Sequence, residues 1–456
     1  MNFTKNKSNM LFIILALAWP TVLEHLMQTA VQYIDVAMVG SLGTDATAAV
    51  GATTTVSWLV NGTVSALAIG FLAYISQALG AKESIKASRA SAQAVSVTVI
   101  CGIICTALTL GVSGILPQLM QVDDNIQALA SQYFFILYSP MLFRCSSIIL
   151  GTVLRSAGDT KTPMLIGVFV NLLNIILNFI FIYPTRNVTL CGYSVKIFGL
   201  GLGVTGAALA SAIAFTLGGI LTFIALWKNS VISPKGQSFL PNKEILTPCL
   251  KISFPNMLQR FGTSLGYVVF ASMVNSLGEI STAAHTIANT VESAFYIPAY
   301  GMQTAAATLA GNAVGALDGK MLKKLKKTFL ILECILMALS GAALFFSAEA
   351  LVSIFTTDKT VLILGATVLK MVALSEPLFG IPIITEGFMQ GMGKTVMPFV
   401  SNILCMWLVR ILGTFIALNF FAGDLIAVWG CMIAHNVVLF IVFLFPIFKT
   451  IKIENS

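Results

Sequence analysis

Charged residues are scarce in this chain of 456 residues, because Asp, Glu, Lys and Arg together make up only 10% of it. Hydrophobic residues make up 57%, and the mean hydropathy is +0.91. A soluble core could not bury that much apolar surface. The composition therefore excludes an ordinary soluble domain and indicates a membrane protein.

Histidine and cysteine are also few, with three and eight residues. The histidines show no spacing typical of a metal or catalytic set; they are His25, His285 and His435. This speaks against a membrane-embedded hydrolase, and we expect neither an enzyme nor a bound cofactor. Cys101 and Cys105 share a helix face, but cysteines in apolar helices are usually packing residues. Only Cys191 falls in an expected outer loop, so no disulfide framework is predicted.

Apolar runs of about 20 residues, the length that an α-helix needs to cross the bilayer, recur along the whole chain. The first run lacks a small-residue cleavage site after a short apolar core, so we expect a retained helix rather than a signal peptide. The predicted fold is an all-α integral membrane protein. Its twelve spanning helices are expected at residues 12–39, 46–79, 88–118, 127–154, 161–183, 203–227, 246–277, 281–315, 328–356, 361–390, 396–419 and 425–448.

The basic residues predict the orientation of these helices. If the N-terminus is cytoplasmic, nearly all loop Lys and Arg lie inside, and only Arg186, Lys196 and Lys359 lie outside. Cytoplasmic loops carry such an excess of basic residues. We therefore expect both termini in the cytoplasm. The net charge of +8 is explained by this topology, so no nucleic-acid partner is expected.

The second half of the chain repeats the first. Residues 20–56 align with 255–291 without a gap, and the same offset places Gly80 on Gly315 and Gly158 on Gly393. Six helices separate matching points, so both halves keep one orientation, as parallel repeats about a pseudo-two-fold axis along the membrane normal. We predict two six-helix bundles, 1–227 and 252–456, joined by a cytoplasmic linker, 228–251. Two facing bundles are typical of a transporter with a midplane binding site.

Four stretches in order, "YIDVAMVG", "LRSAGDTKTPM" (154–164), "NLLNIILN" (171–178) and "MQGMGKTVMP" (389–398), closely resemble motifs of the multidrug and toxic compound extrusion (MATE) family. This family belongs to the MOP superfamily, and the resemblance covers nearly the full chain. It implies a monomer in the bacterial cytoplasmic membrane. Such a protein would export amphiphilic organic cations by alternating access, in exchange for Na⁺ or H⁺.

Two alternatives remain open. The same superfamily includes flippases for lipid-linked precursors, whose cavities should be lined by several Arg or Lys to bind anionic headgroups. Here the intramembrane acids outnumber the bases. A membrane-embedded enzyme, the alternative from another class, would need a nucleophile with a base or a metal set.

Asp35 lies deep in the first apolar run, where a carboxylate costs about 2.5–3.5 kcal/mol at the bilayer centre. Glu24 and Gln28 share its helix face, which must point at protein or water. The repeat places Gln259 and Phe270 at the positions of Glu24 and Asp35, so neither carboxylate recurs. A scaffolding role would more plausibly recur in both halves. The resemblance also implies that Asp35 is the carboxylate that binds the coupling cation.

Asn171, Asn174 and Asn178 share one face of the fifth helix. Their amide oxygens could surround Na⁺ or accept a hydrogen bond from a protonated carboxyl group. The alternative is that the amides join helices. The resemblance matches Asn174 and Asn178 to the family's fifth-helix pair, in which several members carry Asp at the second position. Asp35, Asn174 and Asn178 are thus the candidate cation-coupling residues and the candidate ligands of Na⁺.

Other polar and aromatic residues are candidates for the lining of a substrate cavity. Some carboxylates of the second half could instead be ion-paired with Arg260, Arg410 or Lys370. Pro20, inside the first helix, removes one backbone hydrogen bond and is either a hinge coupled to Asp35 or a static kink. The cavity candidates are Glu24, Gln28, Tyr133, Tyr138, Asn171, Ser211, Gln259, Asn289, Glu292, Tyr296, Glu376 and Glu386.

Overall fold

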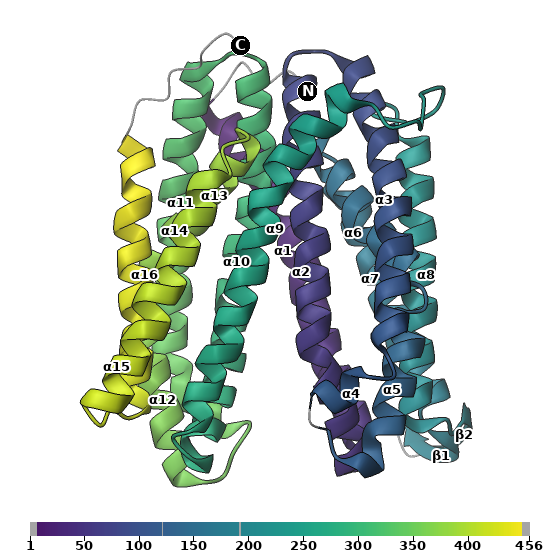
Figure 1. Ribbon diagram of the computed structural model, residues 1–456, viewed down its shortest axis with the longest axis vertical. Helices are drawn as coiled ribbons and strands as arrows, with labels where there is room; N and C mark the ends of the chain where they lie inside the picture. Colours follow the sequence, from purple (N-terminus) through teal and green to yellow (C-terminus); the bar gives the residue numbers. More distant parts are fainter. Residues whose placement is uncertain (1–6, 121, 191–192, 449–456) are drawn as a thin grey trace. The chain divides into compact units, whose positions relative to one another are not determined.

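The computed structural model describes residues 7–120, 122–190 and 193–448, so Cys191 lies outside the described residues. Long helices dominate these residues (Figure 1). The elements are α1 (Lys7–Gly40), α2 (Thr44–Gly80), α3 (Ser84–Val112), α4 (Leu116–Leu119), α5 (Asp124–Tyr138), α6 (Met141–Ser156), α7 (Lys161–Phe181), β1 (Pro184–Leu190), β2 (Tyr193–Leu200), α8 (Gly203–Lys228), α9 (Lys243–Asn275), α10 (Glu279–Gly315), α11 (Gly319–Ser353), α12 (Lys359–Ala373), α13 (Glu376–Gly391), α14 (Val396–Leu404), the π-helix η1 (Cys405–Ile411), α15 (Leu412–Phe420) and α16 (Leu425–Phe448).

Helices cover all twelve of the predicted spans within the described residues. Among the described residues, eight helical segments are long and apolar enough to cross a membrane alone. The pairs α5–α6 and α12–α13, bent by 49° and 55°, provide two more. The remaining predicted spans are α9, of 33 residues, and α10, of 37 residues, which are long enough but less apolar. The prediction of an all-α membrane fold is confirmed.

Some local features were not predicted from the sequence. An antiparallel hairpin of β1 and β2 joins α7 to α8 (Figure 1). Its chain reads "PTRNVTL" and "YSVKIFGL", in which β-branched and aromatic residues recur and favour strands over helix. The fourth predicted span is broken between Tyr138 and Met141, where Pro140 precedes α6 and cannot donate a helical hydrogen bond. The end of the third predicted span forms the separate short helix α4.

The internal repeat is visible in the backbone. Three residues with positive φ in the first half have counterparts at the repeat-related positions of the second half that also have positive φ. Both breaks in the bent spans, after Tyr138 and after Ala373, are related by the same offset. The pairs are Gly43 (121°) with Gly278 (94°), Lys82 (63°) with Leu317 (54°), and Gly158 (83°) with Gly393 (75°).

The ends of α2 and α10 cross at a point that shows the two-fold relation directly. A Cβ on Gly80 would overlap the carbonyl oxygen of Asn312, and a Cβ on Gly315 would overlap that of Gln77. The repeat exchanges these two contacts, because Gly80 corresponds to Gly315 and Gln77 to Asn312. Because the repeat exchanges these two neighbouring contacts, the pseudo-two-fold axis passes between them. Glycine is needed at both positions so that the backbones can approach.

The compact units do not follow the two halves of the sequence. One unit combines α1 up to Val22, Leu72–Glu83 and the chain from Pro248 onward; the other combines Leu23–Phe71 and Ser84–Thr247. In the first unit, Ile14 of α1 is buried in one cluster with Phe329 of α11 and Phe388 of α13. The boundary within α1 falls shortly after Pro20.

The connection between α8 and α9 is shorter than the predicted linker, because α9 begins at Lys243. Its backbone is bound to α3. Gln93 Nε2 donates to the carbonyl oxygen of Leu240 at 2.8 Å, and Ser96 Oγ donates to that of Phe239 at 2.6 Å. These bonds fix the connection to the unit of Leu23–Phe71 and Ser84–Thr247.

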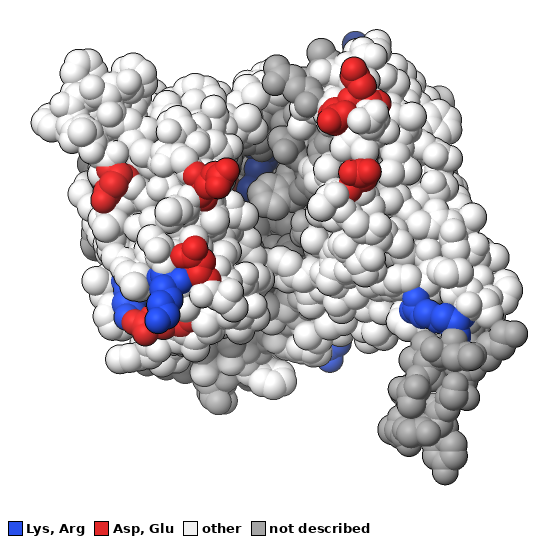
Figure 2. Space-filling view, turned by 90° about the horizontal axis from the view of Figure 1, so that it is seen from below, with Lys and Arg blue, Asp and Glu red and all other residues white. Residues whose placement is uncertain are grey.

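Large apolar side chains lie on the outside of the molecule. Phe346 is 85% exposed and Phe421 is 77% exposed, which would be unfavourable in water and suits contact with lipid. Figure 2 shows one end of the molecule, on which acidic and basic side chains appear only in small, scattered patches. The surface therefore agrees with a chain that passes the membrane many times.

Candidate functional site

Asp35 lies at the centre of a polar group formed by α1, α7 and α8. Asn178 Nδ2 donates to Asp35 Oδ1 at 2.6 Å and also reaches Asn174 Oδ1 at 3.2 Å. Asn174 in turn contacts Ser211 Oγ at 3.0 Å. Both asparagines and Ser211 are buried, while Asp35 is half-buried. The structure thus brings together the three predicted cation-coupling residues and one predicted cavity residue.

The amide of Asn174 fits this group in two orientations. With its nitrogen toward Asp35, it donates to Oδ1 at 3.0 Å and to Oδ2 at 3.3 Å, and its oxygen accepts from Ser211 Oγ. With its oxygen toward Asp35, it accepts from Asn178 instead. The first orientation suits a bare carboxylate, which only accepts hydrogen bonds. The second suits a carboxyl group that has gained a proton or a cation.

Two further amide atoms near this group have no hydrogen-bond partner among the described residues. They are Asn178 Oδ1 and Asn171 Nδ2, and both are buried. A buried polar atom without a partner costs about 1–3 kcal/mol. An acceptor oxygen of this kind can be satisfied by a cation or by a ligand that donates a hydrogen bond. Asn171 lies one helical turn before Asn174 on α7, and its amide nitrogen forms no hydrogen bond to the Asp35 group.

The predicted tyrosines of the fourth span pack into the same unit. Tyr133 borders an apolar cluster that includes Met38 of α1. Tyr138 is buried and donates to Ser57 Oγ at 2.6 Å. The exposed Gln28 lies on α1 between Glu24 and Asp35, as its spacing predicted.

Arg144 is a residue of this region that the sequence analysis missed. Its guanidinium lies 4.4 Å from the ring centre of Phe215 and 5.6 Å from that of Tyr138. Nη1 is buried and has no hydrogen-bond partner within the described ranges. The signal was present, because an arginine in the middle of a predicted span is costly and is usually functional or paired.

Glu24 is bound to Arg155. Nη2 of Arg155 donates to both carboxylate oxygens, at 2.7 and 2.6 Å, and both side chains are largely buried. Gly167 makes room for the pair, because a Cβ there would lie 3.3 Å from Glu24 Cγ. Because the fourth span was expected to end at residue 154, Arg155 was counted among the cytoplasmic loop bases. It lies instead in the last turn of α6, with its guanidinium on Glu24 of α1. The charge of Glu24 is therefore compensated.

Glu386 is the centre of the corresponding group in the second half. Its Oε1 accepts from Gln259 Nε2 at 3.0 Å and from Gln390 Nε2 at 2.9 Å, and its Oε2 accepts from Asn402 Nδ2 at 3.3 Å. Asn256 Oδ1 lies 3.4 Å from Gln390 Nε2. Glu386 is buried, and in the described part of the chain no ion pair to it is formed within 4.0 Å.

The two groups occupy matching positions with different chemistry. The repeat takes Glu24 to Gln259 and Arg155 to Gln390. It also takes Gly151 and Gly167 to Glu386 and Asn402. The first half therefore holds an ion pair between two glycines, whereas the second half fills the glycine positions with a carboxylate and an amide donor. Gln259 and Glu386 were among the predicted cavity residues, whereas Gln390 and Asn402 were not. The repeat could have indicated both, because they occupy the positions that correspond to Arg155 and Gly167.

Three other acidic residues of the second half are buried but not joined to Glu386. Glu292 of α10 and Glu376 of α13 are 7% and 1% exposed. Glu333, which the candidate set left out, is fully buried and neither of its carboxylate oxygens has a hydrogen-bond partner among the described residues. Tyr296 packs edge-on against Phe379 at 5.9 Å between ring centres, and Asn289 lies half-buried on α10.

Two of the three bases named with these acids, Lys370 and Arg410, have other partners. Lys370 pairs with Glu349 at 2.5 Å, and both side chains are exposed. Arg410 is buried, lies 4.2 Å from the ring centre of Phe270 and reaches Met432 Sδ at 2.7 Å. Arg260 is exposed and follows Gln259 of the group around Glu386. In the described residues, neither Lys370 nor Arg410 forms an ion pair with Glu292, Glu376 or Glu386.

The family of the chain follows from a comparison with known families. A model described as MatE matches residues 20–180 and again 255–416. The two matches begin at positions 20 and 255, which the internal repeat pairs with each other. The chain belongs to the MatE family. The resemblance found in the sequence is thereby confirmed, and this is a family of transporters.

Several relatives of this MatE protein have been named. A probable multidrug resistance protein NorM of Thermotoga maritima is 28% identical over 431 residues, covering 92% of this chain and 88% of the relative. The multidrug export protein MepA of Staphylococcus aureus is 25% identical over 374 residues, covering 81% and 78%. Each relative is similar over most of its length.

Solved structures share the fold of this chain. One is an outward-facing multidrug resistance MATE transporter of the MOP superfamily, with a TM-score of 0.86, 24% identity and 96% of both chains covered. Another is a MOP superfamily transporter from Pyrococcus furiosus, with a TM-score of 0.87, 22% identity and coverage of 95% and 94%. That transporter is described as having a binding pocket of reverse polarity that suggests a different function.

Proposed function

We propose that this MatE protein exports amphiphilic organic cations in exchange for an inward-moving cation. The single observation that carries the proposal is the carboxylate of Asp35 inside a membrane helix, held by the neutral amide of Asn178 at 2.6 Å. A carboxylate with neutral partners keeps its charge available for a cation. Multidrug transport in the relatives' names agrees with such a role.

The exchange requires that the coupling ion and the drug use Asp35 in turn. When a proton or a Na⁺ ion is on the carboxylate, an organic cation loses its counter-charge and leaves. When the carboxylate is free, it attracts the next cation. The two orientations of Asn174 provide hydrogen-bond partners for both states. The amide is therefore a component that can follow the charge of Asp35.

Na⁺ is the coupling ion that the geometry favours. Hard cations take oxygen ligands, and the Asp35 carboxylate, the Asn174 amide oxygen in the orientation that accepts from Asn178, and Ser211 Oγ lie in one hydrogen-bonded group. The oxygen of Asn178 is buried and has no hydrogen-bond partner in the described part of the chain. A proton on Asp35 would use only one acceptor, whereas Na⁺ would use several.

Pro20 is the proposed hinge. It lies inside α1, and the boundary between the two compact units crosses α1 directly after Val22. A proline leaves one backbone hydrogen bond of the helix unmade, so the helix bends more easily there. We expect the part of α1 that carries Asp35 to move relative to the part before Pro20 when the charge of Asp35 changes.

The proposed setting is the cytoplasmic membrane of a bacterium, with a monomer whose two termini are cytoplasmic. Aromatic side chains such as Tyr133, Tyr138 and Tyr296 would add cation–π attraction for flat aromatic cations. The candidate cavity residues named above remain proposals for the drug-binding surface.

A flippase for an anionic lipid-linked precursor is the second candidate, and Arg144 is the observation that favours it. Its guanidinium has a buried nitrogen without a hydrogen-bond partner within the described ranges, which an anionic headgroup could satisfy. Arg155 does not add to this argument, because Glu24 compensates its charge. A headgroup cavity should be lined by several Arg or Lys, and Arg144 is a single one, so cation export remains the favoured proposal.

Vesicles containing the purified protein test the coupling ion. Separate Na⁺ and pH gradients are imposed, and the movement of ethidium is followed by its fluorescence. The proposal expects transport with the Na⁺ gradient alone. Equal transport on a pH gradient without Na⁺ would assign the coupling to H⁺, and no cation transport on either gradient would contradict the exporter.

A further inference from the structure

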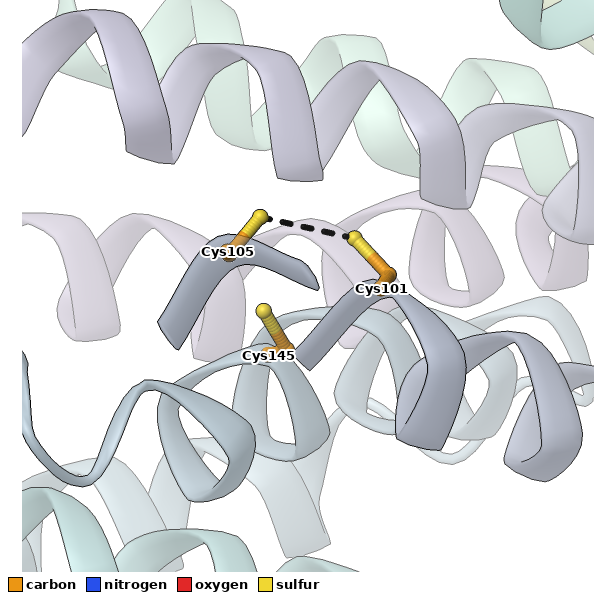
Figure 3. Close-up of side chains that lie close together, drawn as sticks. All are labelled: Cys101, Cys105 and Cys145. Carbon is orange, nitrogen blue, oxygen red and sulfur yellow. Dashed lines mark hydrogen bonds between the residues drawn. The ribbon is translucent and has the colours of Figure 1, made fainter. Parts of the chain in front are cut away.

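Three thiols meet between two helices of the unit formed by Leu23–Phe71 and Ser84–Thr247. Cys101 and Cys105 lie one turn apart on α3, and Cys145 lies on α6 (Figure 3). Their three Sγ atoms all lie within 4.8 Å of one another. The Sγ atoms of Cys101 and Cys105 are 3.8 Å apart. The sequence predicted packing roles for the cysteines and paired only Cys101 with Cys105, because Cys145 is distant in the sequence and spacing along one helix cannot reveal it.

The distances between these sulfurs match those around a bound ion. A bond of about 2.3 Å from metal to thiolate places two thiolates about 3.8–4.0 Å apart at tetrahedral or trigonal angles. The 3.8 Å between the Sγ atoms of Cys101 and Cys105 is therefore close to this separation, and small side-chain rotations on α3 are enough to bring both sulfurs onto one three-coordinate centre. No aspartate, glutamate or histidine of the described residues completes the group to four. A three-coordinate ion fits this ligand set better than tetrahedral zinc.

The two helices that carry the thiols are held close together. A Cβ on Gly102 would lie 2.7 Å from Leu142 Cα, so the backbones of α3 and α6 approach next to the cysteines. Cys145 is fully buried, while Cys101 and Cys105 are half-buried. A group positioned on rigid helices meets the general requirement for a preorganised ion site.

The charge of the bound ion is limited by the surroundings. Ile103 and Ile104 on α3 are 57% and 52% exposed, as expected for side chains that face lipid. A net charge in such a place is costly. Three thiolates around a trivalent centre are neutral, whereas three thiolates around a monovalent or divalent metal are anionic. Sulfur ligands also favour soft ions.

We propose that Cys101, Cys105 and Cys145 bind a trivalent thiophilic metalloid, taken up from water as arsenite. Arsenite exchanges its three hydroxyl groups for the three sulfurs. Three As–O bonds break and three As–S bonds form, and each thiol proton leaves with a hydroxyl group as water. No electron is transferred, so no oxidant or reductant is needed. The bound centre joins α3 to α6.

Arsenite retention by the reduced, purified full chain tests this site. The protein in detergent is incubated with arsenite and desalted, and bound arsenic is measured by mass spectrometry. The wild type should retain one equivalent, and Cys145→Ser should retain at least tenfold less. Cys405→Ser is the matched control, because Cys405 is buried outside the group and its loss should leave retention unchanged. Equal retention by wild type and Cys145→Ser would overturn the proposal.

The coordination of the retained arsenic gives a second, independent measurement. X-ray absorption at the arsenic edge should show three sulfur neighbours and no oxygen. Two sulfurs with one oxygen would contradict the three-thiol site. Arsenite should also raise the melting temperature of the wild type and of Cys405→Ser but not that of Cys145→Ser, because the thiols that remain in Cys145→Ser both lie on α3 and cannot join it to α6. A rise of equal size in Cys145→Ser would overturn the proposal.

Discussion

Arg155 donates from one nitrogen to both carboxylate oxygens of Glu24, at 2.7 and 2.6 Å, and the repeat replaces these two residues by Gln390 and Gln259. In the second half the glutamines meet at Glu386 instead of at each other. One pair of helix positions therefore forms an ion pair in one half, and in the other half it provides two neutral donors to a third residue, Glu386.

Removal of one charge from the Glu24–Arg155 pair should destabilise the protein more than removal of both. Arg155→Gln leaves the buried carboxylate of Glu24 without its ion-pair partner, at a cost on the order of 3 kcal/mol, and Glu24→Gln removes the carboxylate to which Arg155 Nη2 donates twice. The double variant recreates the two glutamines of the second half and should be more stable than either single variant. Melting temperatures in one detergent provide the comparison. A double variant less stable than both single variants would show that the pair is not a self-contained contact.

Gly80→Ala should destabilise the chain by about 1–3 kcal/mol, because the added methyl group overlaps the carbonyl oxygen of Asn312. Gly315→Ala should have a similar effect by symmetry. Gly111 is the control, since nothing lies within 4 Å of the position of its Cβ. Thermal unfolding of the three variants is the measurement. Tolerance of alanine at both Gly80 and Gly315 would contradict the tight crossing of α2 and α10.

Much of the fold could be predicted because hydrophobic runs and a repeat record it directly. The spans and the repeat required only apolar length and matched residues. The break before α6 was missed, since Pro140 lies in a continuous apolar run, and the hairpin of β1 and β2 was missed because its residues were assigned only to a loop.

The candidate site was predictable where one helix carries it and less so where several helices meet. Asp35 and the asparagines of α7 stood out by spacing on a face. The partners of Glu24 and Glu386 are 131 and 127 residues away, in Arg155 and Gln259, and spacing along one helix cannot show such contacts. The position of Arg155 at the end of a span made an inner loop as plausible as the bundle interior.

Loss of the Asn178 side chain should weaken coupling by Na⁺. In Asn178→Ala, Asp35 loses its 2.6 Å hydrogen bond and the site loses one oxygen, so the Na⁺ concentration for half-maximal export should rise about tenfold. Asn171→Ala is the control, because the buried amide nitrogen of Asn171 has no hydrogen-bond partner in the described residues, the Asp35 group included. The same Na⁺ dependence in Asn178→Ala and the wild type would remove Asn178 from the coupling site.

Expression in a pump-deficient bacterium should raise resistance to ethidium-like cations more than to anionic or neutral compounds. The reason is that Asp35 offers a negative charge with neutral partners, and aromatic side chains favour delocalised positive charge. Minimum inhibitory concentrations for several unrelated cations and anions provide the measurement. Protection against anionic compounds that is lost in Arg144→Gln would favour the flippase.

The measurement that tests the central claim most directly compares the wild type with Asp35→Asn in vesicles. Both proteins are reconstituted in equal amounts, a Na⁺ gradient is imposed, and ethidium movement is recorded. Asparagine preserves the shape of the side chain and removes its charge, so the account predicts a folded variant, with an unchanged melting temperature within about 2 °C, that does not transport on the gradient. Gradient-driven transport at the wild-type rate by Asp35→Asn would contradict the account.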